Sequence, residues 1–139
     1  MSKDFDKVVR FLETFRWSDP SRRDENWKNK FLAGLLQDCG TFCRMNTNGK
    51  GADIIGSDFV IEGKNDLLAR TTLQRLLGQI ANYVSCDNVR QVYIVIYGDA
   101  KQTLYRELKR CIADYSQTDV RVKVVGKIVT DDGLYSYRL

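Results

Sequence analysis

Histidine is absent from the sequence, and its absence excludes several classes of enzyme. Hydrolases that use an imidazole as general base need this residue, and so do zinc sites built on imidazole nitrogens. Any hydrolytic chemistry would therefore use carboxylates, lysine, a hydroxyl, a thiol or a metal ion held by oxygen atoms.

Proline and cysteine are scarce. The sequence has 1 proline and 10 glycines in 139 residues, a composition unlike that of fibrous or disordered proteins. The cysteines, Cys39, Cys43, Cys86 and Cys111, form no Cys-x-x-Cys pair. A zinc or iron–sulfur site usually shows close, paired cysteine spacings, so we expect reduced and mostly buried thiols instead.

Long apolar runs are also missing. The longest, from Val92 to Tyr97, has the length of a strand, whereas a membrane-spanning helix needs roughly 20 apolar residues. The residues after Met1 lack the basic and then apolar pattern of a secretory signal. We therefore expect a soluble, cytoplasmic protein with no membrane partner. Its net charge of +4 is compatible with an anionic partner without indicating one.

The spacing of apolar residues predicts alternating helices and strands in a single domain, residues 1–139. Helices are predicted over 3–17, 24–38, 67–84 and 101–115. Strands are predicted over 42–46, 52–55, 59–64, 89–97 and 120–129. This order predicts an α/β fold with a mixed sheet flanked by helices. Residues 1–23 would form an N-terminal helix and its connection, and residues 24–129 the core.

Two charged residues end the strand predicted over 59–64. Glu62 and Lys64 are two positions apart, so their side chains lie on one face of that strand. Asp53, at the start of the neighbouring predicted strand, can place a second carboxylate beside Glu62. Two carboxylates and a backbone carbonyl would suit Mg²⁺ or Mn²⁺. A nearby lysine can orient a metal-bound water and offset charge at a phosphate.

The same acidic-x-Lys pattern occurs a second time, at Glu107-Leu108-Lys109. About one such match is expected by chance in a chain of this composition. The second match lies in a predicted helix, where residues two apart point in different directions, so we interpret it as solvated surface. Glu62 and Lys64 differ from Glu107 and Lys109 in their context. They lie on a predicted strand, Asp53 precedes them on the neighbouring predicted strand, and a predicted helix follows directly.

With this context, the segment from Asp53 to Lys64 resembles the signature of the PD-(D/E)xK nuclease superfamily, which has the restriction-endonuclease-like fold. The family pattern places an acidic residue on one strand and Glu-x-Lys on the next, within an αβββαβ core. The predicted elements from about residue 24 to residue 129 follow that order. Gln79 and Tyr83, four apart on one helical face, resemble the Gln-x-x-x-Tyr motif of RecB-type exonucleases.

The resemblance implies a metal-dependent nuclease that hydrolyses phosphodiester bonds in nucleic acid, with DNA as the favoured substrate. Asp53 and Glu62, helped by the Gly63 carbonyl, would hold Mg²⁺ or Mn²⁺, and Lys64 would position the attacking water. The support for this site or for the substrate strand would come from Gln79 and Tyr83.

Some features leave alternatives open. Glu25 either joins the metal site, as an acidic residue on the first core helix, or is a favourable charge at a helix N-terminus. Gly63 stands where the family usually has a β-branched residue, which predicts a bulge or a close backbone approach. A non-catalytic nuclease-like domain that binds nucleic acid or a protein is the main alternative. A junction-resolvase-like endonuclease is another. A homodimer would suit the cutting of two strands or of a branched junction, each of which requires two cuts.

Basic residues gather in two further places, at Arg22, Arg23, Lys28 and Lys30, and at Arg121, Lys123 and Lys127. Both groups could contact a nucleic-acid backbone, although alternating charges on a strand also fit an ordinary exposed face. The apolar face of the helix over 24–38 is predicted from Trp27, Phe31, Leu32, Leu35 and Leu36.

Overall fold

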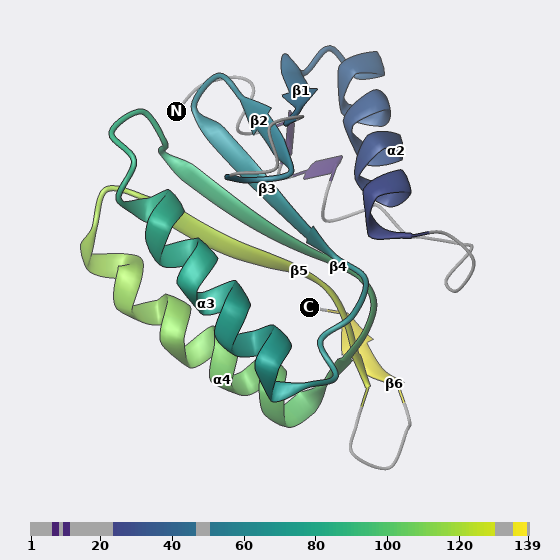
Figure 1. Cartoon of the computed structure of the whole chain (residues 1–139), viewed down its shortest axis with the longest axis vertical. Coiled ribbons are helices and arrows are strands. Elements are labelled where there is room, and N and C mark those ends of the chain that lie inside the picture. Colours follow the sequence, from purple (N-terminus) through teal and green to yellow (C-terminus); the bar gives the residue numbers. More distant parts are fainter. Residues whose placement is uncertain (1–6, 9, 12–23, 47–50, 130–134, 139) are drawn as a thin grey trace.

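The computed structural model describes residues 7–8, 10–11, 24–46, 51–129 and 135–138 (Figure 1). The elements are, in order, α2 (Glu25–Asp38), β1 (Cys43–Met45), β2 (Ile54–Gly56), β3 (Phe59–Lys64), α3 (Arg70–Val84), β4 (Gln91–Lys101), α4 (Gln102–Ala113), the 3₁₀ turn η1 (Asp114–Gln117), β5 (Arg121–Val129) and β6 (Tyr135–Arg138). Within these ranges, no helix has both the length and the apolar character that crossing a membrane requires.

The strands form one open, mixed sheet of 6 strands in the order β1-β2-β3-β4-β5-β6. Strand β2 pairs antiparallel with β1 and with β3, and two residues, Ser57 and Asp58, connect it to β3. Strands β3, β4 and β5 are parallel, since a helix returns the chain after β3 and again after β4. Strand β6 is the last strand of the sheet and pairs antiparallel with β5. The predicted α/β class with a mixed sheet is confirmed.

Helices cover both faces of the sheet. In Figure 1, α3 and α4 lie side by side on one face and α2 lies on the other. Successive side chains of β4 point to opposite faces of the sheet. Val92 and Ile94 pack toward α3 and α4, and Tyr93 and Val95 pack toward α2. All six residues of β3 are buried, as expected for a strand covered on both faces.

The buried stripe of α2 differs from the predicted one. Asp24 caps this helix, accepting a hydrogen bond from the Trp27 N–H at 2.7 Å. The side chains of Trp27 and Phe31 are 38% and 43% exposed, and their rings stack on each other outside the core. Two polar residues, Lys28 and Asn29, are buried instead, together with Leu32, Ala33 and Leu36. The apolar residues alone predict the wrong stripe at these positions, because Lys28 and Asn29 form hydrogen bonds with polar side chains inside the fold.

The other differences are at element ends. Helix α3 begins at Arg70 rather than at residue 67, because the Leu67 backbone bonds to Asp99 and Lys101 and so extends the pairing of β4. Strand β6 was not predicted. The cysteines are free, but only Cys43 is buried, so the expectation of mostly buried thiols is wrong. Of the helix predicted over 3–17, residues 7, 8, 10 and 11 are helical, and the others lie outside the described residues.

Candidate active site

The Glu62–Lys64 pair lies in the middle of the sheet, at the carboxyl end of β3. The residues are 2% and 9% exposed, and the Lys64 Nζ lies 3.1 Å from the Glu62 Oε2. Their two-residue spacing on a strand puts both side chains on the face covered by α3. A buried charge is costly unless it is paired, so this ion pair is what makes burial of both groups tolerable.

Asp53 lies opposite Glu62, directly before β2. The antiparallel register pairs Ile54 with Ile61, and one further step brings Asp53 level with Glu62 on the same face. The Asp53 Oδ2 accepts a hydrogen bond from the Gly63 N–H at 2.9 Å, which anchors the carboxylate to β3. The structure thus brings together three residues that the sequence analysis singled out: Asp53, Glu62 and Lys64.

Tyr83 reaches the same cluster from α3. Its hydroxyl donates a hydrogen bond to the Glu62 Oε1. Burial, followed by the bond to Glu62, raises the pKa of the Tyr83 hydroxyl. The phenol therefore keeps its proton at neutral pH and remains a donor. Each Glu62 oxygen then has its own partner, with Tyr83 on one and Lys64 on the other.

The environment of Glu62 favours its protonated form. Burial is the largest cause that raises its pKa, to about 7, and repulsion from Asp53 adds to it. The Tyr83 hydrogen bond and the Lys64 charge act in the opposite direction. A carboxyl group with a pKa near neutrality, next to a second carboxylate, is a site where a bound cation would relieve repulsion.

Gln79 lies on α3 one turn before Tyr83. The two residues share a helical face, as their spacing of four predicts. Its Oε1 is buried and has no hydrogen-bond partner among the described residues. No hydrogen bond joins it to Glu62 or Lys64 in that part of the chain. The Gln79 oxygen is thus an acceptor without a donor on the helix that carries Tyr83.

Gly63 is required by the close approach of α2 to β3. A Cβ at this position would lie 1.9 Å from the Asn29 Oδ1 and 2.8 Å from the Tyr97 Cε2. The β3–β4 register runs without a shift through this residue, so there is no bulge. The glycine in the middle of the Glu-x-Lys tripeptide therefore reflects a close backbone approach by α2, one of the two predicted explanations.

A polar network fills the α2 side of Gly63. The Tyr97 hydroxyl donates to the Asn29 Oδ1 at 2.7 Å, and the Lys28 Nζ donates to the Asn65 Oδ1 at 3.0 Å. The Lys28 ammonium, on a residue only 2% exposed, also lies 5.9 Å from the centre of the Tyr97 ring. The Glu25 Oε2 accepts from the Asn65 N–H at 3.1 Å.

The carboxylates lie close enough to this network to act on it electrostatically. Burial is the main cause that raises the pKa of the Tyr97 hydroxyl, and the charges of Asp53, Glu25 and Glu62 raise it further. The described residues nevertheless include no group of three or more histidine, cysteine or acidic side chains that could hold a metal ion. The structure places the Glu25 carboxylate on the Asn65 amide, and a role for it at a metal ion stays a prediction.

Lys28, Asn29 and Tyr97 are the part of the site that sequence reasoning missed. The sequence predicts that Lys28, as one of a group of basic residues, could contact a nucleic-acid backbone, and this prediction is wrong because the side chain is buried. A signal was present, since Lys28, Leu32 and Leu36 repeat every four residues and form one helical stripe. Of the remaining members of that group, Arg22 and Arg23 lie outside the described residues, and Lys30 is exposed on α2.

Two carboxylates side by side offer the oxygen donors that a hard divalent cation prefers. Asp53 and Glu62 thus fit the expected magnesium ion by donor chemistry.

The chain matches no protein-family model, no curated protein and no solved structure. The interpretation of the site therefore depends on its own geometry and on the resemblance of its residues to the nuclease motif.

Proposed function

We propose that this protein is a metal-dependent nuclease that hydrolyses phosphodiester bonds in DNA, with the αβββαβ core of the PD-(D/E)xK superfamily. The observation that carries the proposal is the buried Glu62–Lys64 pair at the end of β3, with Asp53 opposite it. The order α2-β1-β2-β3-α3-β4 agrees with the core that the motif implies.

Asp53 and Glu62, with the Gly63 carbonyl, would hold Mg²⁺ or Mn²⁺. A bound divalent ion supplies an activated water and stabilises negative charge on the phosphate. Lys64 is fixed by Glu62 at 3.1 Å and offers its ammonium protons to the attacking water or to a phosphate oxygen. Tyr83 holds the other Glu62 oxygen and so fixes the orientation of this carboxylate.

Gln79 would serve the substrate rather than the metal. Its buried Oε1 has no partner among the described residues, and leaving such an acceptor unpaired is unfavourable. A water or a hydroxyl of the substrate strand that donates to it would remove that cost. This role matches the one implied by the Gln-x-x-x-Tyr resemblance.

One observation favours the alternative of a non-catalytic domain that binds nucleic acid or a protein. Both oxygens of Glu62 already have partners within the chain, as a purely structural ion pair would require. A structural ion pair alone, however, does not require a second carboxylate beside Glu62, whose charge repels that of Glu62.

A cleavage panel separates the two functions. The purified protein is incubated with Mg²⁺ or Mn²⁺ and with single-stranded, duplex, flap and four-way-junction DNA. The nuclease proposal predicts cutting of at least one substrate, its loss in the presence of a chelator, and its loss in Glu62→Gln. No cutting of any DNA or of matched RNA, with a folded protein and both metals, would support the binding domain instead. The products also distinguish exonuclease, endonuclease and junction-resolving action, and a sizing measurement in the same buffer tests the homodimer.

A further inference from the structure

Asn65 directly follows Lys64, and hydrogen bonds from α2 and from β4 hold it in place. Its N–H donates to the Glu25 Oε2 at 3.1 Å, and its Oδ1 accepts from the Lys28 Nζ at 3.0 Å. Its carbonyl oxygen accepts from the Gly98 N–H at 2.7 Å. These contacts form the Asn65 clamp, which consists of Glu25, Lys28, Asn65 and Gly98.

The alternation of side chains along β3 explains why α2 can bind Asn65. Lys64 projects toward α3, so its two neighbours in the chain, Gly63 and Asn65, project toward α2. Gly63 has no side chain and lets α2 come close. Glu25 and Lys28 are three residues apart and so share a face of this helix. One helical turn can therefore bind both the backbone and the side chain of the residue after Lys64.

Gly98 is required by the contact on the β4 side. A Cβ at this position would lie 2.5 Å from the Asn65 carbonyl oxygen. Two residues further on, the Leu67 N–H donates to the Asp99 carbonyl oxygen at 2.9 Å. The chain therefore stays bonded to β4 beyond the last residue of β3, and the backbone next to Lys64 is fixed on this side as well.

Stability alone does not explain the burial of Lys28. The residue is 2% exposed, and its ammonium lies 3.0 Å from the Asn65 Oδ1 and 5.9 Å from the centre of the Tyr97 ring. Replacing a buried ion by an apolar side chain of similar volume is often neutral or stabilising. A buried ammonium that binds the residue next to Lys64 therefore indicates a role at the carboxylate cluster.

We propose that Glu25 and Lys28 are positioning residues for Lys64. Through Asn65 they fix the backbone from which the Lys64 side chain extends, and so they hold its ammonium beside Glu62, 3.1 Å from the Oε2. A misplacement of about 1 Å can lower the rate of a reaction about 100-fold. The inference rests on the proposed nuclease function, and it assigns Glu25 to the Asn65 amide rather than to the metal ion.

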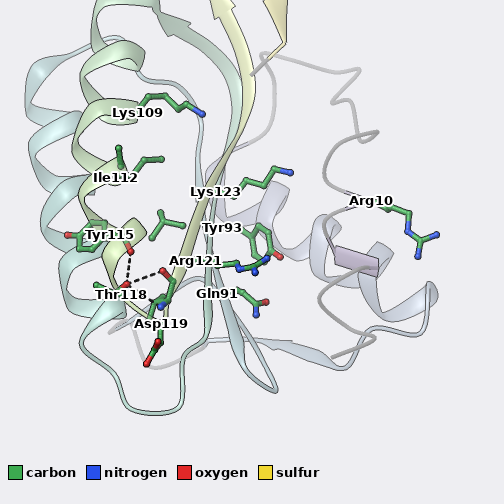
Figure 2. Close-up of a pocket in the computed structure, with 13 residues that line it drawn as sticks. Arg10, Gln91, Tyr93, Lys109, Ile112, Tyr115, Thr118, Asp119, Arg121 and Lys123 are labelled. Atoms are coloured by element: carbon green, nitrogen blue, oxygen red, sulfur yellow. Dashed lines mark hydrogen bonds between the residues drawn. The ribbon is translucent and has the colours of Figure 1, made fainter. Parts of the chain in front are cut away.

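A cavity of about 1020 Å³ borders β4 and β5 and is separate from the clamp (Figure 2). None of the clamp residues lines it. Gln91 and Tyr93 line it from the α2 side of the sheet, whereas Ile112 and Val122 line it from the side of α3 and α4. Because its lining lies on both sides of the sheet, this cavity does not form one ligand site beside Lys64.

Single-turnover cleavage at several Mg²⁺ concentrations tests the positioning role. Glu25→Ala and Lys28→Met should each lower the maximal rate about tenfold or more. The Mg²⁺ concentration for half of that rate should stay unchanged, because neither residue binds the ion. Glu25→Gln keeps an acceptor for the Asn65 N–H and loses only the charge, so its rate should stay within about threefold of the wild type. Two exposed controls, Asp38→Ala on the same helix and Lys101→Met, should cleave as the wild type does.

A second measurement needs no cleavage. NMR reports the exchange rate of the Asn65 amide proton and the motion of the Lys64 ε-methylene group. Glu25→Ala should speed the exchange at least about tenfold and increase that motion, and Glu25→Gln should leave both close to the wild type. Lys28→Met should increase the motion of the Lys64 side chain while the Asn65 N–H stays bonded to Glu25. A residue that only supports the fold would leave the order of Lys64 unchanged.

The proposal is overturned if Glu25→Ala and Lys28→Met, both folded by circular dichroism, cleave at the wild-type rate or leave Lys64 as ordered as before. It is also overturned if both Glu25 variants need more Mg²⁺, since Glu25 would then be a metal ligand. Because Glu25 and Lys28 bind different atoms of Asn65, either variant tests the clamp if the other fails to fold. A wild type that cuts no DNA contradicts the nuclease function, and a loss of Lys64 order in the variants would still support the clamp.

Discussion

The tripeptides Glu62-Gly63-Lys64 and Glu107-Leu108-Lys109 have the same pattern of charge and opposite structures. On strand β3 the two charged residues share a face and pair with each other at 3.1 Å. On helix α4 they point in different directions, and Glu107 pairs instead with Arg70, with contacts at 3.1 and 3.0 Å. The pKa of Glu62 is raised by burial, whereas that of Glu107 is lowered by Arg70. Secondary structure and burial, rather than spacing, make one of these segments a candidate site.

Alanine at the middle position should destabilise the fold in both tripeptides, but for opposite reasons. Leu108 is fully buried, so Leu108→Ala should lower the free energy of unfolding by about 2–5 kcal/mol through lost contacts and a cavity. Gly63→Ala should lower it by roughly 1–3 kcal/mol for the opposite reason, overpacking against Asn29. Urea unfolding measures both.

Two variants serve as controls for the glycine result. Gly78 lies on α3, and a Cβ there would meet nothing within 4 Å, so Gly78→Ala should be neutral or stabilising. Adding Asn29→Ala to Gly63→Ala should recover part of the lost stability. A Gly63→Ala protein as stable as the wild type would contradict the close approach of α2.

The two glutamates should give pH dependences of opposite sign. Because the pKa of Glu62 is raised to about 7, the native state binds its proton more tightly than the unfolded state does. This contribution is complete below the ordinary pKa and is lost as the pH rises to about 7, by roughly 3 kcal/mol. Glu107 has a lowered pKa, so its smaller contribution is present at neutral pH and is lost on acidification.

Denaturant unfolding at several values between pH 4 and pH 8 tests this contrast. Glu62→Gln should flatten the fall in stability toward neutral pH, and Glu107→Gln should leave that fall unchanged. Equal curves for the wild type and Glu62→Gln would show that the Glu62 carboxyl is not perturbed in the folded protein.

The sequence predicted β3 with its observed bounds because its apolar run is continuous and flanked by turn residues. It also predicted that Asp53, Glu62 and Lys64 would meet, since two short antiparallel strands fix that geometry locally. It did not predict burial of Lys28 and Asn29. Their partners Asn65 and Tyr97 lie 37 and 68 residues away in the chain, and local periodicity contains no information about such distant contacts.

Divalent ions should stabilise the protein through Glu62 and not through Glu107. An ion that binds only the native state raises the melting temperature by mass action, here by a few degrees at millimolar Mg²⁺ or Mn²⁺. The increase should be larger at pH 8 than at pH 6, because the ion competes with the proton on Glu62. Asp53→Asn and Glu62→Gln should abolish it in thermal melts, and Glu107→Gln should retain it. Equal melting temperatures with and without the ions in the wild type would argue against the metal site.

The smallest effect belongs to the exposed pair on α3 and α4. Replacing Arg70 by alanine should let the pKa of Glu107 return toward its ordinary value, because the Arg70 hydrogen bond is the main cause that lowers it. Carboxyl chemical shifts in an NMR titration measure this change. Stability should hardly respond, since exposed ion pairs contribute little. A Glu107 pKa that stays low in Arg70→Ala would show that another group controls it.

The most direct measurement is the single-turnover rate of DNA cleavage by Lys64→Met, with Lys101→Met as the control for an exposed lysine. Methionine keeps most of the volume of Lys64, and Glu62 can take up a proton when the ammonium is removed because its pKa is already raised, so the fold should be retained, as circular dichroism can verify. Lys64 is proposed to act mainly on the reacting groups, so we predict a loss of at least about 100-fold in rate with DNA affinity largely retained. Cleavage by Lys64→Met at the wild-type rate would contradict the assignment of this cluster as the active site.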